Sequence, residues 1–372
     1  MQEIKKIVIV CGARPNFIKV APLLRALKKY PEKFSSVLIH TGQHSDENMN
    51  KVFFDQLSIP SPDYWLNVNG GSHSKQTGKI MIEFEKVILN IKPDLVLVVG
   101  DVNSTMACSI TTKKCGFLLA HIEAGLRSRD LSMPEEINRI ITDSISDYFF
   151  VTEESGVQNL LREGKSKDKI FYVGNIMIDS LKNEEKNILN GAFIKEDIQK
   201  LSHKISNYAL TTIHRPSNVD TKEKFWKVLD CLIKASKKIE IIWPLHPRTK
   251  KQLQKYDIDL PQSIHLLDAL PYREVIYLMI NSKLVITDSG GIQEETTALT
   301  KPCFTMRENT ERPITVLEGS NKLVGNNYKK LLKEIDMILY QKENSFKVPF
   351  LWDGNSSQRI CRKLLEILNK KN

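Results

Sequence analysis

The sequence lacks the short motifs of several common enzyme classes. It contains no G-x-x-x-x-G-K-[ST] phosphate loop, which argues against an ATPase, and no G-x-G-x-x-G turn, which argues against a tightly bound NAD. Its six cysteines form no C-x-x-C pair, and most lie in apolar runs, so we expect reduced core thiols rather than a zinc site. We therefore predict neither a metal nor a redox cofactor.

Long apolar segments are also missing. No apolar run approaches the ~18 residues that a membrane-spanning helix needs. Near the N-terminus, Lys5-Lys6 are followed only by Ile7–Cys11 before Gly12, which is too short for the core of a signal peptide. We expect a cytoplasmic protein without a membrane partner.

The net charge of +10 does not indicate nucleic-acid binding. The lysines are scattered, often beside glutamates, and no basic stripe is interleaved with aromatic residues. The arginines are more informative, because guanidinium groups suit phosphate and carboxylate. Many of them fall in loops singled out below: Arg14, Arg127, Arg129, Arg139, Arg215, Arg248, Arg307 and Arg312.

Short β-branched runs alternate with segments that have the apolar periodicity of amphipathic helices. The chain length of 372 residues favours two domains. The expected strands are Lys6–Cys11, Ser36–Thr41, Asp94–Val99, Phe117–Ile122, Tyr148–Thr152, Ile170–Val173, Tyr208–Ile213, Glu240–Trp243, Ile264–Leu266, Leu284–Thr287 and Cys303–Met306. Helices are expected at Phe17–Tyr30, Glu135–Ser146, Lys222–Lys238 and Ser356–Leu368, the last with Ser356 as its N-cap.

We predict an α/β fold of two Rossmann-like domains with parallel sheets. The first comprises residues 1–174 and is joined by the C-terminal helix 356–372; the second comprises residues 175–355, and the polar segment from Asn175 to about Gly191 is the expected linker. Unusual polar residues directly follow the strands in both halves. Ligands of open α/β sheets bind at the carboxyl ends of strands, so we expect these loops to surround one cleft between the domains.

The turn Asp288–Glu295 is the strongest of these loops. Its residues Ser289, Gly290 and Gly291 open a helix, where free N–H groups and the helix dipole favour an anion. Glu295 lies one turn further on and is a candidate acceptor for ribose hydroxyls. An ordinary capped turn remains the alternative.

The loop Gly12–Asn16 is a second candidate for binding an anion. Arg14 is placed to bind a phosphate, and Lys19 lies on the first turn of the next helix. An exposed loop arginine is the alternative. His214 and Arg215 follow another apolar strand and suit a departing phosphate, although a buried structural histidine would look the same.

Carboxylates gather after two other strands. Asp101 and Glu123 each end an almost wholly apolar strand, and Glu135 follows Pro134 at a helix start. Carboxylates in one cleft can divide acid and base roles. The alternative for Glu135 is that it only decorates a helix N-terminus.

Taken together, these residues resemble the non-hydrolysing UDP-N-acetylglucosamine 2-epimerase family. The matching blocks run in order over nearly the whole chain: Gly12–Pro22 (GARPNFIKVAP), Thr41–His44 (TGQH), Gly100-Asp101, His121–Arg127 (HIEAGLR), Pro134–Arg139 (PEEINR), His214-Arg215, Asp288–Glu295 (DSGGIQEE) and Thr310–Pro313 (TERP).

The resemblance implies a GT-B-type architecture, usually as a homodimer, and inversion at C2 of a UDP-sugar without a cofactor. UDP is eliminated across C1–C2 to give a 2-acetamidoglucal and then added back. By the same resemblance, the catalytic residues are Asp101, Glu123, Glu135, His214 and Lys19. The UDP-binding residues implied by the resemblance are Arg14, His214, Ser289, Gly290, Gly291 and Glu295.

Two positions depart from the family pattern. Many relatives read HRREN where this chain reads His214–Asn218 (HRPSN), and members activated by a second UDP-sugar usually carry glutamine where this chain has Asp46. Three alternatives to the epimerase stay open. They are a hydrolysing enzyme that releases ManNAc and UDP, a C2-epimerase of a modified UDP-sugar such as a 2,3-diacetamido uronate, and a non-catalytic UDP-sugar sensor. The carboxylate that removes the C2 proton is also left open.

Overall fold

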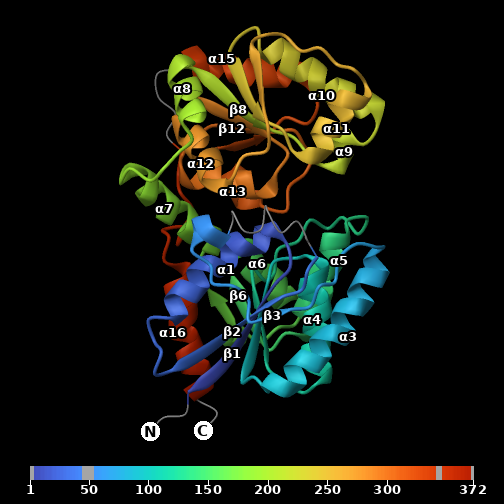
Figure 1. Cartoon of the computed structure of the whole chain (residues 1–372), viewed down its shortest axis with the longest axis vertical. Helices are drawn as coiled ribbons and strands as arrows, with labels where there is room; N and C mark the ends of the chain where they lie inside the picture. Colours follow the sequence, from blue (N-terminus) through green and yellow to red (C-terminus); the bar gives the residue numbers. More distant parts are fainter. Residues whose placement is uncertain (1–3, 44–53, 341–345, 370–372) are drawn as a thin grey trace. The chain divides into compact units, whose positions relative to one another are not determined.

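The computed structural model describes residues 4–43, 54–340 and 346–369. The chain forms two compact units (Figure 1). Unit 1 comprises Met1–Lys182 and Phe350–Asn372, and unit 2 comprises Asn183–Pro349. In the described part of the chain, no helix is long and apolar enough to span a bilayer.

Unit 1 is built on a seven-stranded, wholly parallel sheet in the order β3-β2-β1-β4-β5-β6-β7. Its strands are β1 (Lys5–Cys11), β2 (Phe34–His40), β3 (Tyr64–Trp65), β4 (Leu95–Val99), β5 (Leu119–Ile122), β6 (Tyr148–Val151) and β7 (Ile170–Tyr172). The central strands are buried on both faces, as expected of a parallel sheet that helices cover on each side.

The helices of unit 1 cover this sheet (Figure 1). They are α1 (Arg14–Leu27), α3 (His73–Ile91), α4 (Asn103–Lys114), α5 (Pro134–Ile145), α6 (Glu154–Arg162), the first half of α7 (Ile176–Leu189) and α16 (Ser356–Asn369), with the 3-10 turn η1 (Lys167–Lys169). Helix α3 packs against α4, and α4 packs against α5. The C-terminal helix α16 packs against α1, the first helix of the chain.

The start of α16 differs from the sequence-based expectation. The backbone N–H groups of Ser356 and Ser357 donate to the two carboxylate oxygens of Asp179, at 3.0 and 2.7 Å. The hydroxyl oxygen of Ser356 is buried without a hydrogen-bond partner among the described residues. The prediction that Ser356 is the N-cap is therefore wrong, because a carboxylate distant in sequence caps the helix instead.

The segment expected to be a linker is helix α7 rather than an irregular connection. Ile176, Ile178 and Leu181 on its first two turns are buried in unit 1. The boundary between the units falls within this helix, between Lys182 and Asn183. Its polar composition reflects the exposed face of an amphipathic helix rather than a loop.

Unit 2 repeats the architecture with a six-stranded parallel sheet in the order β10-β9-β8-β11-β12-β13. Its strands are β8 (Tyr208–Thr212), β9 (Glu240–Pro244), β10 (Ile264–Leu267), β11 (Leu284–Thr287), β12 (Cys303–Thr305) and β13 (Asn321–Leu323). Its helices are α8 (Glu196–Lys204), α9 (Pro216–Val219), α10 (Lys222–Ala235), α11 (Pro247–Lys255), α12 (Tyr272–Asn281), α13 (Gly290–Ala298), α14 (Pro313–Leu317) and α15 (Tyr328–Tyr340).

The prediction of two Rossmann-like domains with parallel sheets is confirmed. Every strand expected from the sequence is present, with ends shifted by at most two residues. The sequence did not predict β3 and β13. Both are edge strands of only two and three residues, so they are too short to show the hydrophobic pattern that reveals the central strands.

Candidate active site

Each sheet reverses its strand order at one point, and several of the predicted site residues follow the strands that border it. In unit 1 the reversal lies between β1 and β4, and in unit 2 it lies between β8 and β11. At such a point neighbouring strands send their following loops to opposite faces of the sheet, which opens a crevice at the carboxyl edge.

The loop after β1 is organised by its own asparagine. The side-chain oxygen of Asn16 accepts from the N–H groups of Gly12 and Ala13 at 3.2 and 3.1 Å, and its amide donates to the carbonyl of Val99 at 3.0 Å. Asn16 thus joins the ends of β1 and β4. The first two N–H groups of the predicted anion-binding turn are therefore already occupied. The Arg14 side chain lies outside the described part of the structure, as do His44 and Asp46.

Lys19 and Glu123 form a buried ion pair beside this turn. Each is only 5% exposed, and the Lys19 ammonium donates directly to the Glu123 carboxylate. A Cβ atom on Gly100 would lie 3.3 Å from Lys19 Nζ and 3.5 Å from Glu123 Oε2. The missing side chain of Gly100 therefore leaves open the space in front of the ion pair.

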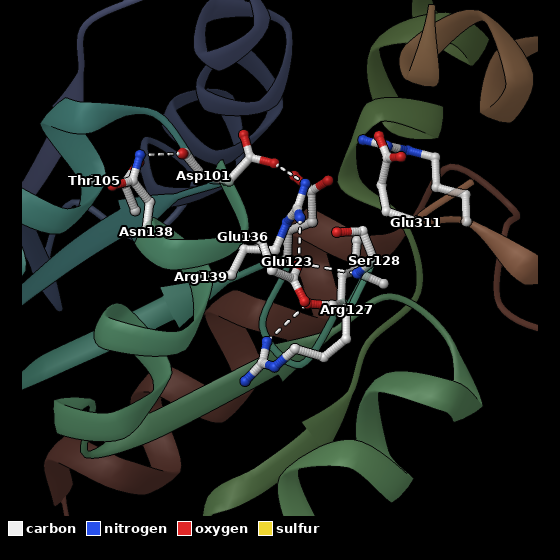
Figure 2. Close-up of polar contacts among 12 residues, drawn as sticks. Asp101, Thr105, Glu123, Arg127, Ser128, Glu136, Asn138, Arg139 and Glu311 are labelled. Atoms are coloured by element: carbon white, nitrogen blue, oxygen red, sulfur yellow. Dashed lines mark hydrogen bonds and ion pairs between the residues drawn. The ribbon is translucent and has the colours of Figure 1, made fainter. Parts of the chain in front are cut away.

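Asp101 forms a second ion pair at the end of β4. Its Oδ2 lies 2.5 Å from Nη2 of Arg139 on α5, and the Asn138 amide donates to the Asp101 carbonyl at 2.8 Å (Figure 2). Arg139 is buried, whereas the Asp101 side chain is partly exposed. Asp101 therefore meets a buried cation while 23% of its side chain remains exposed.

The adjacent glutamates at the start of α5 have different surroundings. The Glu136 carboxylate is buried and accepts from the N–H groups of Ser128 and Arg129, both at 2.9 Å, and from Arg139 at 2.8 Å. Burial opposes ionisation of Glu136, but these hydrogen bonds outweigh it and lower its pKa. Glu136 thus holds the loop after β5 in place (Figure 2). Glu135 is half-buried, and no described residue bonds to its carboxylate, so that carboxylate stays available.

In unit 2, Asp288 fastens the loop after β8 to the end of β11. This buried carboxylate accepts from the N–H groups of His214 at 3.0 Å and Arg215 at 2.8 Å, and from the Asn218 amide at 3.0 Å. Although burial opposes ionisation, its contacts with His214 and these donors lower the pKa of Asp288. Nδ1 of His214 lies 3.2 Å from Asp288, and the His214 side chain is 35% exposed. A half-exposed imidazole oriented by a carboxylate is suited to an anionic ligand.

The predicted phosphate turn opens helix α13. The N–H of Ser289 donates to the Thr287 hydroxyl at 2.9 Å, and the helix begins at Gly290. A Cβ atom on Gly290 would lie 2.5 Å from Arg312 Nη1 and 2.9 Å from Glu311 Oε1. Glycine is therefore required at position 290 so that this guanidinium can approach the helix N-terminus.

Glu311 holds three arginines together near that helix end. It accepts from Arg312, from Arg307 at 2.8 Å and from Arg215 at 3.4 Å. Arg312 also contacts buried Glu294 at 2.9 Å. Burial opposes ionisation of Glu311, but the three guanidinium groups hold its pKa well below the ordinary value. Three guanidinium groups therefore gather beside the N-terminus of α13, and guanidinium groups suit a phosphate.

Glu295 is buried one turn into α13, where it accepts from the Tyr272 hydroxyl at 2.8 Å. Burial, with the charge of Glu294, raises the pKa of Glu295 from 4.5 to about 8. The carboxyl is therefore largely protonated at neutral pH unless further donors reach it. Ribose hydroxyls are donors of that kind.

The structure thus places the described candidate residues in the loops that follow parallel strands or in the helices that these loops enter. Lys19, Asp101, Glu123 and Glu135 belong to unit 1, and His214, Ser289, Gly290, Gly291 and Glu295 belong to unit 2. The sequence did not show what the supporting residues contact. The motif blocks quoted above contain Asn16, Asn138, Arg139 and Glu311 without indicating their partners, and Tyr272 carried no signal at all. Across the described residues, no group of three His, Cys, Asp or Glu side chains could hold a metal ion.

Comparisons with known proteins agree with this geometry. The family model described as UDP-N-acetylglucosamine 2-epimerase matches residues 25–365. The UDP-N-acetylglucosamine 2-epimerase of Methanocaldococcus jannaschii is 43% identical over 369 residues, covering 96% of this chain and 98% of the relative. The UDP-2,3-diacetamido-2,3-dideoxy-D-glucuronate 2-epimerase of Pseudomonas aeruginosa is 40% identical over 323 residues, covering 86% of this chain and 88% of the relative.

A solved structure supports the same assignment. The crystal structure of the Methanocaldococcus jannaschii UDP-GlcNAc 2-epimerase in complex with UDP-GlcNAc and UDP matches with a TM-score of 0.88 and 42% identity, covering 97% of this chain and 99% of that chain. The match extends over both units, and the motif blocks run through both of them. The chain belongs to the UDP-N-acetylglucosamine 2-epimerase family.

Proposed function

We propose that this protein interconverts UDP-N-acetylglucosamine and UDP-N-acetylmannosamine by inversion at C2, through elimination and re-addition of UDP. The observation that carries the proposal is the set of carboxylates in unit 1. Asp101 and Glu123 are each paired with a buried cation, whereas Glu135 has no partner among the described residues. Differently placed carboxylates around one substrate can serve opposite faces of a sugar ring.

The proposed reaction moves one proton and one leaving group in each half. A carboxylate takes the C2 proton, the C2–H electrons form the C1–C2 double bond, and the C1–O bond breaks with its electrons staying on UDP. In the reverse half, a second carboxylic acid protonates C2 on the other face, and UDP oxygen attacks C1. Asp101, Glu123 and Glu135 are the proposed acid–base residues, and Lys19 is proposed to support Glu123.

The remaining candidate residues are assigned to the proposed UDP site. His214, Ser289, Gly290, Gly291 and Arg14 are proposed to bind the diphosphate, where cations and free N–H groups stabilise the departing charge. Glu295 is proposed to accept from the ribose hydroxyls. The arginines around Glu311 support this assignment, since Arg312 lies beside the N-terminus of α13.

A modified UDP-sugar is the second candidate substrate. The relative from Pseudomonas aeruginosa, 40% identical, is named for a UDP-2,3-diacetamido-2,3-dideoxy-D-glucuronate. Such a substrate needs room for a second acetamido group at C3 and a partner for the C6 carboxylate. The two substrates share the C2 chemistry, so the choice between them concerns specificity rather than mechanism.

One experiment tests the proposal. The purified protein is incubated with UDP-GlcNAc in D2O and followed by NMR. Deuterium at C2 of intact UDP-ManNAc is the expected result. Free ManNAc and UDP would indicate the hydrolysing reaction instead. Turnover of only the diacetamido uronate would establish the modified substrate, and binding of UDP-sugars with no turnover of either would indicate a sensor.

We further propose that the protein acts as a homodimer in the cytoplasm. Helices α3 and α5 expose apolar side chains at helical spacing, namely Ile82, Leu89, Ile137 and Ile140, and both helices pack against α4. Exposed apolar residues on neighbouring helices favour association. All six cysteines are free, which suits a reducing compartment. Sedimentation of the wild type and of Ile82→Lys tests the dimer.

A further inference from the structure

A buried histidine lies directly behind the carboxylates of unit 1. His121 on β5 is fully buried, and its Nε2 lies 2.9 Å from the carbonyl oxygen of Gly100 at the end of β4. A carbonyl oxygen can only accept, so Nε2 carries a hydrogen. Nδ1 of the same ring lies 2.7 Å from Oδ1 of Asp143 on α5.

Asp143 is fully buried and acts as an acceptor on both of its oxygens. Its Oδ2 accepts from the N–H of Gly125 at 3.0 Å and lies 2.7 Å from Arg127 Nη1. Arg127 is in turn held by Glu163 at 2.7 Å. Burial opposes ionisation of Asp143, but His121 and Arg127 lower its pKa. Gly100 and Asp143 therefore hold the two ring nitrogens of His121 from opposite sides.

These contacts end on the backbone beside two proposed acid–base residues. Gly100 directly precedes Asp101, and Gly125 follows Glu123 by two residues. The backbone around Glu123 and Gly125 is tightly constrained. Glu123 has a positive φ of 73°, a conformation that costs a non-glycine residue about 1 kcal/mol or more. A Cβ atom on Gly125 would lie 2.4 Å from the carbonyl oxygen of Gly156.

Helix α5 therefore approaches Asp101 from two directions. Arg139 and Asn138, on its middle turns, bond Asp101 directly. Asp143, one turn further along, acts through His121 on the peptide that precedes Asp101. A buried polar pair such as His121 and Asp143 adds little stability compared with apolar side chains of the same volume. Its clearest consequence is geometric, since it holds two strand ends and a loop in one arrangement.

We propose that His121 and Asp143 are positioning residues for proton transfer, which together hold Asp101 and Glu123 at the separation that C2 inversion requires. This inference rests on the proposed function. It assigns neither residue a contact with the sugar. Proton transfer depends steeply on the placement of the acid and the base, and a displacement of about 1 Å can cost about 100-fold in rate.

Three variants separate the contacts of this pair. His121→Gln places an amide where Nε2 stood and keeps a donor for Gly100, whereas His121→Asn places one where Nδ1 stood and keeps a donor for Asp143. Asp143→Asn removes the charge but keeps an acceptor for Gly125. We expect kcat to fall by about 10-fold to 100-fold in each variant, with KM and the Kd for UDP changed less than about threefold.

Asp147→Asn is the matched control. Asp147 also ties β5 to its surroundings, because it accepts from the Leu119 N–H at 2.8 Å and from Lys113 at 2.7 Å. It does so at the amino end of the strand, away from Asp101 and Glu123. We expect its kcat to stay within about twofold of the wild-type value. If Asp147→Asn loses as much kcat as the His121 variants, the inference is overturned. It is also overturned if kcat is unchanged in every His121 variant.

The histidine spectrum tests the pair independently of turnover. In protein labelled with ¹⁵N-histidine, the signal that disappears in His121→Gln should show a hydrogen on Nε2, as the contact with the Gly100 carbonyl requires. A ring without that hydrogen would overturn the inference even if the enzyme is active. Wild-type protein that shows the Nε2 hydrogen but turns over neither UDP-sugar would instead contradict the proposed function. Any variant that does not fold is replaced by the next of the three.

Discussion

Replacing Glu295 by glutamine is expected to stabilise the fold at neutral and higher pH. The carboxyl of Glu295 is fully buried against Tyr272, and burial raises its pKa from 4.5 to about 8. The unfolded chain therefore ionises Glu295 more readily than the folded chain does. Its contribution to stability is fully present below pH 4.5, is lost as the pH rises towards 8, and is constant above that value.

The size of the effect follows from the shift. Each pH unit between the two values costs about 1.4 kcal/mol, so the total loss approaches about 5 kcal/mol above pH 8 and is about 3 kcal/mol at pH 7. Glutamine cannot ionise, and its side-chain oxygen can still accept from Tyr272. The free energy of unfolding of Glu295→Gln should therefore exceed that of the wild type by an amount that grows with pH.

Chemical denaturation of both proteins at pH 5, 7 and 9 measures this difference. Glu83→Gln is the control, because the Glu83 side chain is 41% exposed and pairs with neighbouring Lys86 on α3. Its stability difference from the wild type should not depend on pH. If the difference in unfolding free energy between wild type and Glu295→Gln is the same at pH 5, 7 and 9, the reasoning is refuted. Such a result would mean that Glu295 has the same pKa in the folded and the unfolded protein.

The same carboxyl links UDP binding to protons. If ribose hydroxyls donate to Glu295 as proposed, they favour its ionised form, so UDP binding near pH 7 releases a proton. Calorimetry in two buffers with different ionisation enthalpies should detect that release in the wild type and not in Glu295→Gln. Release of equal size in both proteins would remove Glu295 from the ribose site.

Three further substitutions test separate parts of the structure. Lys19→Met leaves the Glu123 carboxylate buried without its cation, and it should cost about 3 kcal/mol of unfolding free energy. Adding Glu123→Gln should restore stability but not turnover. Asp179→Ala removes the acceptor for the first N–H groups of α16, and it should cost about 1 kcal/mol and speed amide exchange in that helix. Gly290→Ala places a methyl group against Arg312 and Glu311, so it should weaken UDP binding at least about tenfold by calorimetry. Gly78→Ala, with no atom within 4 Å of the added carbon, should leave UDP binding unchanged.

The sequence alone determined the architecture and the location of the candidate residues. Alternating apolar strands and amphipathic helices are local patterns, and they sufficed to predict parallel sheets in two domains. The side of the sheet was also predictable, because a polar residue directly after a parallel strand lies at its carboxyl edge. Asp101, Glu123, His214 and Ser289 could be identified in this way, and the order of the motif blocks indicated the family.

Only the tertiary structure decided how those residues are paired. Lys19 meets Glu123 from 104 residues away, Arg139 meets Asp101 from 38, and Asp179 caps a helix that begins 177 residues later. Each pairing depends on which distant elements pack together and on how completely they exclude water. Neither factor can be predicted from the spacing of residues along the sequence. The same burial separates Glu136, which is held ionised by its donors, from the half-buried Glu135 beside it. Burial also raises the pKa of Glu295, where the sequence showed an ordinary glutamate.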